Sequence, residues 1–239
     1  MEIWGHRGAY DFAPENTLTA IQLTVDMGAD GVEFDIQLTR DGEVVVIHDE
    51  TINRTSNGSG FVKDFTLPEI KKINFNKKGI TKPHFMEIPT LDEVLQLLKP
   101  AKIKINIELK TGIIYYEDIE AKALETVIRH DMQDRVVWSS FNHYSVQKLK
   151  QLEPNTETAL LSGSEIHITG EQCAKTGASA LHPHIGQLRY PGLVKECHDR
   201  GIKVRAWTIN EPDGFKQAKD LSIDGVITNR IDAAKEYFR

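Results

Sequence analysis

Short hydrophobic runs rich in β-branched residues alternate along the chain with segments in which hydrophobic residues recur at helical spacing. The runs predict strands at about residues 2–6, 31–38, 104–110, 135–140, 157–162, 178–183, 203–209 and 225–228. The helical spacing predicts helices at residues 14–27, 91–98, 116–130, 145–152, 190–200 and 212–221. This alternation is typical of βα units around a parallel sheet. In a chain of 239 residues, it predicts an α/β fold of the (β/α)8 TIM barrel class.

One hydrophobic run, at residues 44–48, does not fit the barrel pattern because it follows the second predicted strand after a short turn at Asp41 and Gly42. A crossover to a parallel strand needs a dozen or more residues, so this run is predicted to turn back as a hairpin. Residues from about 50 to 90 are loop-like, with a short helical pattern at 67–73. We expect a single catalytic domain over residues 1–239 with a small insertion after the second strand, which is either a functional lid or a tolerated surface insertion.

Two predicted strands carry polar residues at every second position. These residues are Glu33, Asp35 and Gln37 in the first of the two strands and Asn106, Glu108 and Lys110 in the other. The alternate positions are apolar and should pack against helices, so the polar side chains are expected to point toward the barrel axis. Branched aliphatic side chains usually fill that interior, and a buried carboxylate needs a partner or a metal.

The three carboxylates of Glu33, Asp35 and Glu108 lie late in their strands, at the end of the barrel where catalytic groups are found. An oxygen-rich site with open positions favours a hard divalent cation, Mg²⁺ or Ca²⁺, over zinc. The alternative is a buried salt-bridge network in which the acids pair with Arg7 and Lys110. Because such networks stabilise less than apolar packing, we favour the metal site.

Two histidines are expected at the same end of the barrel. His6 ends the first predicted strand, and His48 ends the hairpin run and is followed by Asp49, whose carboxylate can orient the imidazole. Histidines titrate near neutral pH, so this pair offers a general acid and a general base. A divalent cation together with Arg7 and Lys110 would stabilise negative charge on a phosphate. The residues therefore indicate phosphoester cleavage.

The composition and charge exclude several classes of binding partner. The net charge of −6 and the pI near 5.9 argue against nucleic acid and against a polybasic membrane-binding patch. The two cysteines, Cys173 and Cys197, lie in unlike contexts and suggest neither a zinc motif nor a disulfide framework. We expect no signal peptide and no membrane span, because no apolar run approaches about 18 residues, and we therefore expect a cytoplasmic location. The oligomeric state is not indicated.

Five motifs occur in order over nearly the whole chain: "HRG" at 6–8, "PENT" at 14–17, "EFDIQLTRDGEVVVIHD" at 33–49, "ELK" at 108–110 and "AWTIN" at 206–210. Together they resemble the glycerophosphodiester phosphodiesterase family. The resemblance implies a TIM barrel with a small insertion after the second strand, and metal-dependent hydrolysis of a small-molecule glycerophosphodiester to glycerol 3-phosphate and an alcohol. It also implies a cyclic phosphate intermediate, formed when the 2-hydroxyl of the glycerol attacks phosphorus.

Position by position, the resemblance implies that His6 and His48 are the acid/base pair and that Arg7 and Lys110 contact phosphate. It further implies that the ligands of Mg²⁺ or Ca²⁺ are Glu33, Asp35 and Glu108. A substrate hydroxyl is then the first nucleophile, so no serine or cysteine nucleophile is required. Gly8 would let the backbone turn away after the two functional side chains of "HRG".

Several other residues have open roles. Trp207 is either a wall for the glycerol or alcohol moiety or a core residue, and Phe141 is a weaker candidate of the same kind. Glu15 and Asn16 are expected to support Arg7 and the first helix. Structural or solvent-facing roles are expected for His182 and His184. Surface or packing roles are expected for His84, His130, His143, His167 and His198.

Two other functions are compatible with parts of the pattern. A barrel glycosidase could use Glu33 and Glu108 as its two carboxylates, but it would leave Arg7, Lys110 and both histidines without a role. A barrel that binds a phosphorylated ligand without turnover would need the cations and the metal, but it would not need two histidines. The preferred alcohol and the choice between Mg²⁺ and Ca²⁺ are left open by the sequence.

Overall fold

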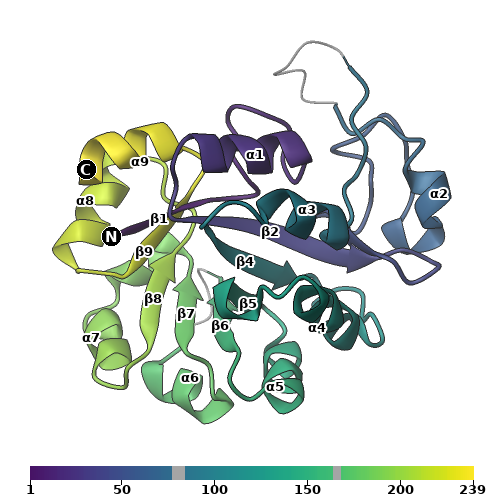
Figure 1. Cartoon of the computed structure of the whole chain (residues 1–239). Coiled ribbons are helices and arrows are strands. Elements are labelled where there is room, and N and C mark those ends of the chain that lie inside the picture. The colour runs from purple at the N-terminus through teal and green to yellow at the C-terminus, as the bar shows by residue number, and fades with distance from the viewer. Residues whose placement is uncertain (77–83, 164–167) are drawn as a thin grey trace.

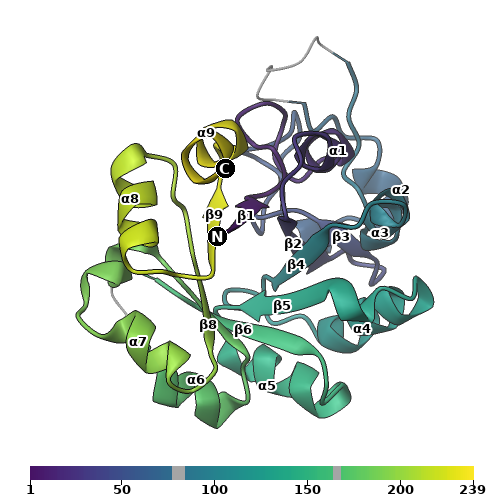
Figure 2. The same ribbon diagram turned by 60° about the vertical axis from the view of Figure 1, so that its left-hand side comes forward.

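The computed structural model describes residues 1–76, 84–163 and 168–239. In this part of the chain, parallel strands form a closed barrel with helices outside it, which confirms the predicted TIM barrel (Figures 1 and 2). The barrel strands are β1 (Glu2–Gly5), β2 (Gly31–Leu38), β4 (Lys104–Leu109), β5 (Val136–Ser140), β6 (Glu157–Ser162), β7 (Ala180–Pro183), β8 (Lys203–Ala206) and β9 (Gly225–Thr228). Each strand pairs in parallel with its neighbour, and β1 closes the barrel by pairing with both β2 and β9.

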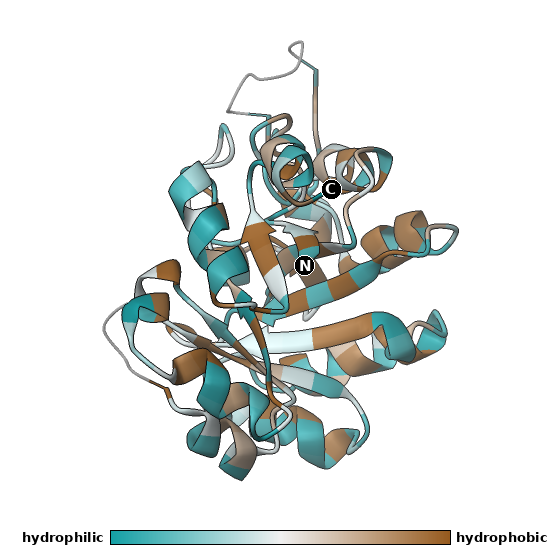
Figure 3. Ribbon diagram, turned by 90° about the vertical axis from the view of Figure 1, so that its left-hand side faces the viewer, coloured by the Kyte–Doolittle hydropathy of each residue, from teal (hydrophilic) through white to brown (hydrophobic). Residues whose placement is uncertain are grey.

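Helices cover the outside of the barrel and bury an apolar layer against the strands. They are α1 (Leu18–Asp26), α3 (Leu91–Leu98), α4 (Ile119–Arg129), α5 (His143–Leu152), α6 (Gly170–Thr176), α7 (Leu193–His198), α8 (Pro212–Asp220) and α9 (Ile231–Phe238). Short 3₁₀ turns lie at Gln133–Arg135 and Ile185–Arg189. Hydrophobic and hydrophilic residues alternate along some of the strands, such as β2, and around the helices, so one side of each of these elements is apolar (Figure 3).

The predicted hairpin is confirmed. Strand β3 (Val44–Val46) runs antiparallel to β2, with Ile36 opposite Val46, and it is not part of the closed barrel. Gly42 in the turn has a φ of 80°, a conformation that glycine adopts without strain.

The segment after the hairpin is the small insertion, at the upper right of Figure 1. It contains a 3₁₀ turn (Val62–Asp64) and helix α2 (Leu67–Ile70), which begins with a capping box between Thr66 and Glu69. It has a small hydrophobic core of its own, made of Val45, Ile47, Ile52, Val62, Ile70, Phe75 and Ile88. Because this core includes residues of the hairpin run, the insertion is anchored to the barrel through β3.

Several predicted boundaries were wrong, and each has a local cause. Helix α1 begins at Leu18 instead of residue 14, because Asn16 has a φ of 57° and the side chain of Thr17 caps the helix. Helix α7 begins at Leu193 instead of residue 190, because Gly192 has a φ of 85°. Strand β8 ends at Ala206, so the predicted strand over 203–209 is too long.

The amino-terminal end of the barrel interior is filled by an aromatic ring and a buried cation. Trp4 is fully buried, and a Cβ added to Gly31 would lie 2.1 Å from its ring. The guanidinium of Arg205 is also fully buried and lies 5.1 Å from the Trp4 ring centroid. It pairs with Glu2 at 2.8 Å and with Glu157 at 3.0 Å. These paired charges are far from the carboxyl ends of the strands and stabilise the base of the barrel.

Candidate active site

A pocket of about 170 Å³ lies among the carboxyl ends of the strands. Its lining comes from seven barrel strands or the loops that follow them, and from the hairpin run: His6, Arg7, Glu33, His48, Asn106, Glu108, Phe141, Leu161, Trp207 and Ile227. The lining combines ionisable side chains with apolar and aromatic ones. Such a pocket at this end of a TIM barrel is the expected position of an active site.

Three carboxylates meet at this pocket. One oxygen from each of Glu33, Asp35 and Glu108 lies within 4.8 Å of the other two, and all three residues are buried. They are neighbours because β2 and β4 are in register, which places Asp35 beside Glu108. Asp35 Oδ1 is buried and has no hydrogen-bond partner among the described residues. An unpartnered buried carboxylate oxygen within an all-oxygen donor set fits a hard divalent cation.

The positive groups around these three acids only partly offset the burial and mutual repulsion of the carboxylates. Burial and the neighbouring carboxylates of Asp35 and Glu108 raise the pKa of Glu33 well above its usual range. Burial and Asp35 likewise raise the pKa of Glu108, although Lys110 opposes the shift. Burial opposes ionisation of Asp35 too, but nearby positive groups and hydrogen bonding hold the pKa of that carboxyl below its usual range. A divalent cation would remove the repulsion that favours a proton on Glu33.

Two permanent cations flank the carboxylates. Lys110 Nζ donates to Glu108 at 2.8 Å and lies 3.8 Å from Asp35, and Arg7 Nε lies 3.8 Å from Asp35. Burial disfavours the ammonium ion, but the two acids outweigh that effect and raise the pKa of Lys110 to about 12. Both cations therefore stay charged at neutral pH and can bind phosphate oxygens.

The backbone of the "HRG" motif turns sharply at the end of β1. Arg7 has a φ of 54°, and its backbone N–H donates to Glu33 Oε2 at 2.8 Å. Gly8 has a φ of 81°, and a Cβ there would lie 2.7 Å from the backbone of Ala20. The close approach of helix α1 therefore requires glycine at this position, where the sequence predicted that the chain turns away.

Both predicted catalytic histidines use Nδ1 for a hydrogen bond to an oxygen. His6 Nδ1 lies 2.8 Å from Asn229 Oδ1, and His48 Nδ1 lies 2.7 Å from Asp49 Oδ1. Each oxygen accepts, so each Nδ1 carries hydrogen and each neutral ring leaves Nε2 as an acceptor. His48 Nε2 lies 3.2 Å from Lys110 Nζ. Burial, and then the charge of Arg7, lower the pKa of His6 to about 4, so this imidazole is neutral at pH 7.

The apolar part of the lining includes two aromatic rings. The ring centroids of Phe141 and Trp207 lie 5.5 Å apart, with the planes at 90°. Trp207 Nε1 donates to the backbone oxygen of His182 at 2.8 Å, and the ring of His184 packs edge-on against the tryptophan at 5.2 Å. Trp207 lines the pocket and also packs against the barrel core, so both of the roles weighed from the sequence have a structural basis.

The remaining histidines lie outside the pocket lining where they are described. His182 is fully buried with both ring nitrogens unpartnered in the described part of the chain, and His184 is partly buried beside Trp207. Surface or peripheral positions are occupied by His84, His130, His143 and His198. His167 lies outside the described residues. No position in this group contradicts the structural or surface roles expected for it.

Three residues near the pocket received no role from the sequence. Asn229 follows β9 and fixes the ring of His6, and Asn106 lines the pocket with a buried, unpartnered Oδ1. Arg54, from the insertion, contacts both Glu15 and Asp49. The sequence did indicate that Asn106 faces the barrel interior, because Asn106 lies on the same polar face of its strand as Glu108. Asn229 and Arg54 lie in turns, where alternation gives no direction for a side chain.

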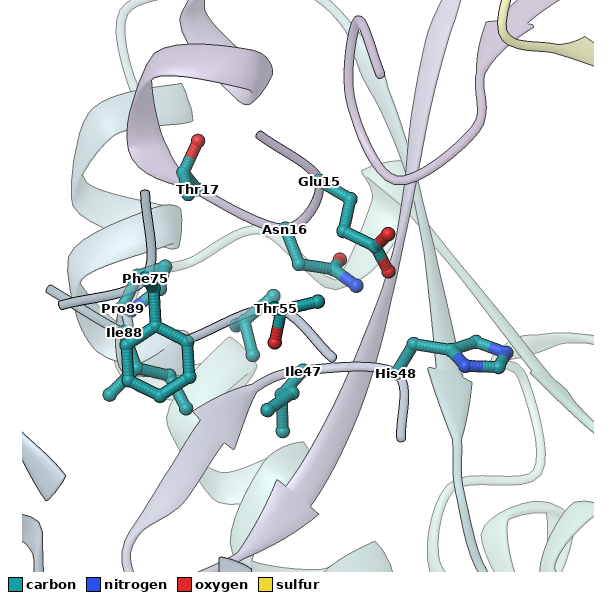
Figure 4. A pocket seen from close by; sticks show the side chains of 10 residues that line it. Glu15, Asn16, Thr17, Ile47, His48, Thr55, Phe75, Ile88 and Pro89 are labelled. Atoms are coloured by element: carbon teal, nitrogen blue, oxygen red, sulfur yellow. The ribbon is translucent and has the colours of Figure 1, made fainter. Parts of the chain in front are cut away.

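Behind His48 lies a second, small cavity of about 10 Å³ (Figure 4). It is bordered by the segment before helix α1, the hairpin run and the insertion, and Asn16 and Thr55 line it. Thr55 Oγ1 is buried without a hydrogen-bond partner among the described residues. The volume suits about one water molecule, so this cavity is a packing space between elements and not a substrate site.

Most of the residues for which the sequence predicted a role in chemistry line the pocket, and Asp35 and Lys110 lie directly beside that lining. The family profile that matches the chain, over residues 6–233, is described as the glycerophosphoryl diester phosphodiesterase family. The chain belongs to this family. The family resemblance inferred from the five motifs is therefore confirmed, and the protein is an enzyme of the phosphodiesterase class.

Relatives with this activity in their names span nearly the full chain. A glycerophosphodiester phosphodiesterase of Caldanaerobacter subterraneus is 40% identical over 94% of this chain and 92% of its own. A glycerophosphodiester phosphodiesterase of Bacillus altitudinis is 37% identical over 98% of this chain and 96% of its own.

Solved structures agree with the fold. A phosphodiesterase of Oleispira antarctica, in complex with the product sn-glycerol-3-phosphate, superimposes with a TM-score of 0.90 at 26% identity and covers 99% of this chain and 96% of its own. A glycerophosphodiester phosphodiesterase of Agrobacterium tumefaciens has a TM-score of 0.85 at 28% identity and covers 99% of each chain.

Proposed function

We propose that this protein hydrolyses glycerophosphodiesters to glycerol 3-phosphate and an alcohol in the pocket at the carboxyl ends of the barrel strands. The observation that carries this proposal is the meeting of three carboxylates, two cations and two histidines beside an apolar wall. Family membership supports the same reaction, as does the product held by the Oleispira antarctica relative. A glycosidase would use only two of these carboxylates.

A divalent cation, Mg²⁺ or Ca²⁺, is the proposed cofactor, held by Glu33, Asp35 and Glu108. When bound, such a cation supplies positive charge that stabilises the phosphate oxygens during the reaction. Arg7 and Lys110 bind the same phosphate and hold it next to the histidines. These two cations remain charged at neutral pH, so they add electrostatic stabilisation in a pocket that is partly shielded from water.

His6 and His48 are the proposed proton-transfer groups. Neutral His6 suits the first acceptance of a proton, from the 2-hydroxyl of the glycerol, through its free Nε2. His48 enters this step protonated on both ring nitrogens, and as the hydroxyl oxygen attacks phosphorus it gives the Nε2 proton to the leaving alcohol and a cyclic phosphate forms. Water then opens this ring to glycerol 3-phosphate, and the two histidines exchange roles. Asn229 and Asp49 keep the rings oriented for both steps.

The aromatic wall is the proposed contact surface for the organic part of the substrate. Trp207 and Phe141 present ring surface in the pocket lining, and Lys110 Nζ lies 5.9 Å from the centroid of the Phe141 ring. Rings of this kind bind the apolar surface of a glycerol or an alcohol, and they attract a cationic headgroup by cation–π interaction. Trp207 is thus assigned to substrate binding, with Phe141 as its partner.

The cytoplasm remains the proposed location. In residues 1–76, 84–163 and 168–239, no helix has both the length and the apolar character needed to cross a bilayer. The cysteines of this part of the chain, Cys173 and Cys197, are buried and unpaired. Unpaired cysteines are common in reducing compartments, which supports this location.

The decisive experiment measures glycerol 3-phosphate released from glycerophosphocholine by the purified protein, before and after treatment with EDTA, with Mg²⁺ or Ca²⁺ then added back. We expect EDTA to abolish product release and one cation to restore it. Glu33→Gln and Glu108→Gln should weaken binding of the cation alone, measured by calorimetry. Full activity in EDTA would refute the metal site, and no product from a panel of headgroups would refute the proposed reaction.

A further inference from the structure

A continuous chain of ion pairs and hydrogen bonds runs along one side of the active site. Arg7 Nη1 donates to Glu15 Oε1 at 2.9 Å, and at the other end His48 Nδ1 donates to Asp49 Oδ1 at 2.7 Å. The side chain between these two pairs is Arg54, which comes from the insertion. The chain therefore begins at a proposed phosphate ligand and ends at a proposed proton-transfer group.

The guanidinium of Arg54 contacts both carboxylates in a forked arrangement. Toward Glu15, its Nη1 and Nη2 donate to the two oxygens at 2.5 and 2.7 Å. Toward Asp49, its Nε and Nη2 donate to the two oxygens at 2.7 and 2.9 Å. A planar guanidinium can bind two carboxylates in this way, whereas an ammonium group cannot reproduce both forks.

The two carboxylates differ in burial but depend on the same arginine. The Glu15 side chain is 5% exposed and that of Asp49 is 25% exposed, while Arg54 is 44% exposed. Burial alone would raise the pKa of Asp49, but hydrogen bonds from Arg54 and His48 lower it to about 2. The pKa of Glu15 is also lowered, since Arg54 and Arg7 outweigh the effect of burial. Both carboxylates are therefore ionised and paired at neutral pH.

The arrangement adds a link between two segments at the mouth of the barrel, each of which is also hydrogen-bonded to Asp35 of β2, through Asn16 and through Ile47 N. Figure 4 shows Glu15 in the segment before α1 and His48 at the end of the hairpin run, with both side chains extending toward the same side. The other side of these segments borders the small cavity, so packing leaves space there. The contacts of Arg54 connect the side chains of Glu15 and Asp49 directly, which the hydrogen bonds to β2 do not do.

We propose that Arg54 is a positioning residue of the active site. Through Glu15 it fixes the guanidinium of Arg7. Through Asp49 it fixes the imidazole of His48. The insertion thus acts on catalysis by holding the phosphate-binding side and the proton-transfer side of the pocket at a constant separation, and not by contact with the substrate.

This proposal rests on the proposed function and makes a specific kinetic prediction. Arg54→Ala should lower kcat/KM about 10- to 100-fold, the usual cost of losing a residue that orients a functional group. Asp49→Asn should mainly lower kcat, because Asp49 contacts His48 directly. Glu15→Gln should mainly raise KM, because Glu15 contacts Arg7 directly. Arg54→Ala should change both constants, and millimolar guanidinium ion should restore part of its lost activity.

A matched control is Arg40→Ala. Arg40 also ties the hairpin turn to the insertion, because its guanidinium donates to Asp64 O and Glu69 Oε2, and none of these three residues lines the pocket. We expect wild-type kinetics from this variant. Binding of Mg²⁺ or Ca²⁺ alone, measured by calorimetry, should be unchanged in both arginine variants, since neither arginine contacts the three carboxylates of the metal site.

The results of these experiments distinguish a failure of the positioning role of Arg54 from a failure of the proposed reaction. If neither wild type nor Arg40→Ala releases glycerol 3-phosphate, the proposed reaction fails. If both are active and Arg54→Ala retains wild-type kcat and KM, or if Arg40→Ala shows the same loss, the positioning role is wrong. Should Arg54→Ala not fold, Arg54→Lys decides: we expect a smaller loss with the same pattern, and wild-type kinetics from it would overturn the forked contact.

Discussion

Replacing Asn229 with leucine tests whether His6 transfers protons through the nitrogen that faces the pocket. Asn229 Oδ1 accepts a hydrogen bond of 2.8 Å from His6 Nδ1, which leaves Nε2 without hydrogen in the neutral ring. The asparagine is itself held in place, because its backbone N–H donates to Asn210 Oδ1 at 2.9 Å. Leucine has a similar size and offers no acceptor, so His6 can then place its hydrogen on either nitrogen and rotate.

The magnitude follows from the contact that is lost. A buried donor left without its partner costs about 1–3 kcal/mol, and this cost falls on the orientation that catalysis requires. Because about 1.4 kcal/mol corresponds to a tenfold change in rate, kcat should fall about 5- to 150-fold. The backbone contact of His6 N with Thr228 O, at 2.9 Å, does not involve the Asn229 side chain, so the fold around β1 should persist.

The assay is the pH dependence of kcat for glycerol 3-phosphate release, with Asn229→Asp as the matched variant. Aspartate keeps the acceptor and should retain more activity than leucine at pH 7. The pKa of His6 is lowered to about 4, so activity should fall as pH decreases through that value. The negative charge of aspartate should raise the pKa of His6. The activity of Asn229→Asp should therefore begin to fall at a higher pH than that of the wild type. Wild-type kcat in Asn229→Leu would refute the role of the hydrogen bond in orienting His6.

Three further predictions follow from residues described above. His6→Ala or His48→Ala should each lower the rate about 10²- to 10⁴-fold while calorimetry shows unchanged metal binding, and near-normal activity in both would contradict the acid/base assignment. Glu2 has its pKa lowered from 4.5 to about 2, because two basic partners outweigh burial, so its stabilisation is complete above pH 4.5 and is lost as pH falls toward 2. The midpoint of thermal unfolding should therefore depend less on pH between 4.5 and 2 in Glu2→Gln than in the wild type. The same pH dependence in both proteins would count against a stabilising role for the ion pairs of Glu2. Gly31→Ala should destabilise the fold by about 1–3 kcal/mol, since the added carbon overlaps Trp4, and an unaltered unfolding midpoint would show that the ring moves without cost.

The sequence was sufficient to predict the position of a side chain wherever the alternation of polar and apolar residues determines which way that side chain points. In β2, strict alternation over Glu33, Phe34 and Asp35 showed which side chains face the barrel axis, and the same reasoning placed Glu108 beside them. The short turn at Gly42 was enough to predict the hairpin, because chain length alone excluded a parallel crossover. These predictions depend on local geometry that every strand shares.

The roles of Arg54 and Asn229 and the start of helix α1 could not be predicted from the sequence in this way. Arg54 lies among turn-forming residues, where a side chain has no fixed direction until the insertion packs on the hairpin. Asn229 acts on a residue at the opposite end of the sequence, so only barrel closure brings the pair together. The start of α1 was predicted too early because Asn16, in its left-handed conformation, donates to Asp35 instead of continuing the helix. In each case a long-range polar contact outweighs the local preference.

The pairing of the first strand with the last also governs how the enzyme is made. Strand β1 is synthesised before its partner β9, and Glu2 to Gly5 pair with Gly225 to Thr228. Until β9 has been made, one edge of β1 is unpaired and Asn229 is not present to orient the ring of His6. The geometry that the proposed chemistry requires at His6 therefore forms only once β9 has joined the barrel.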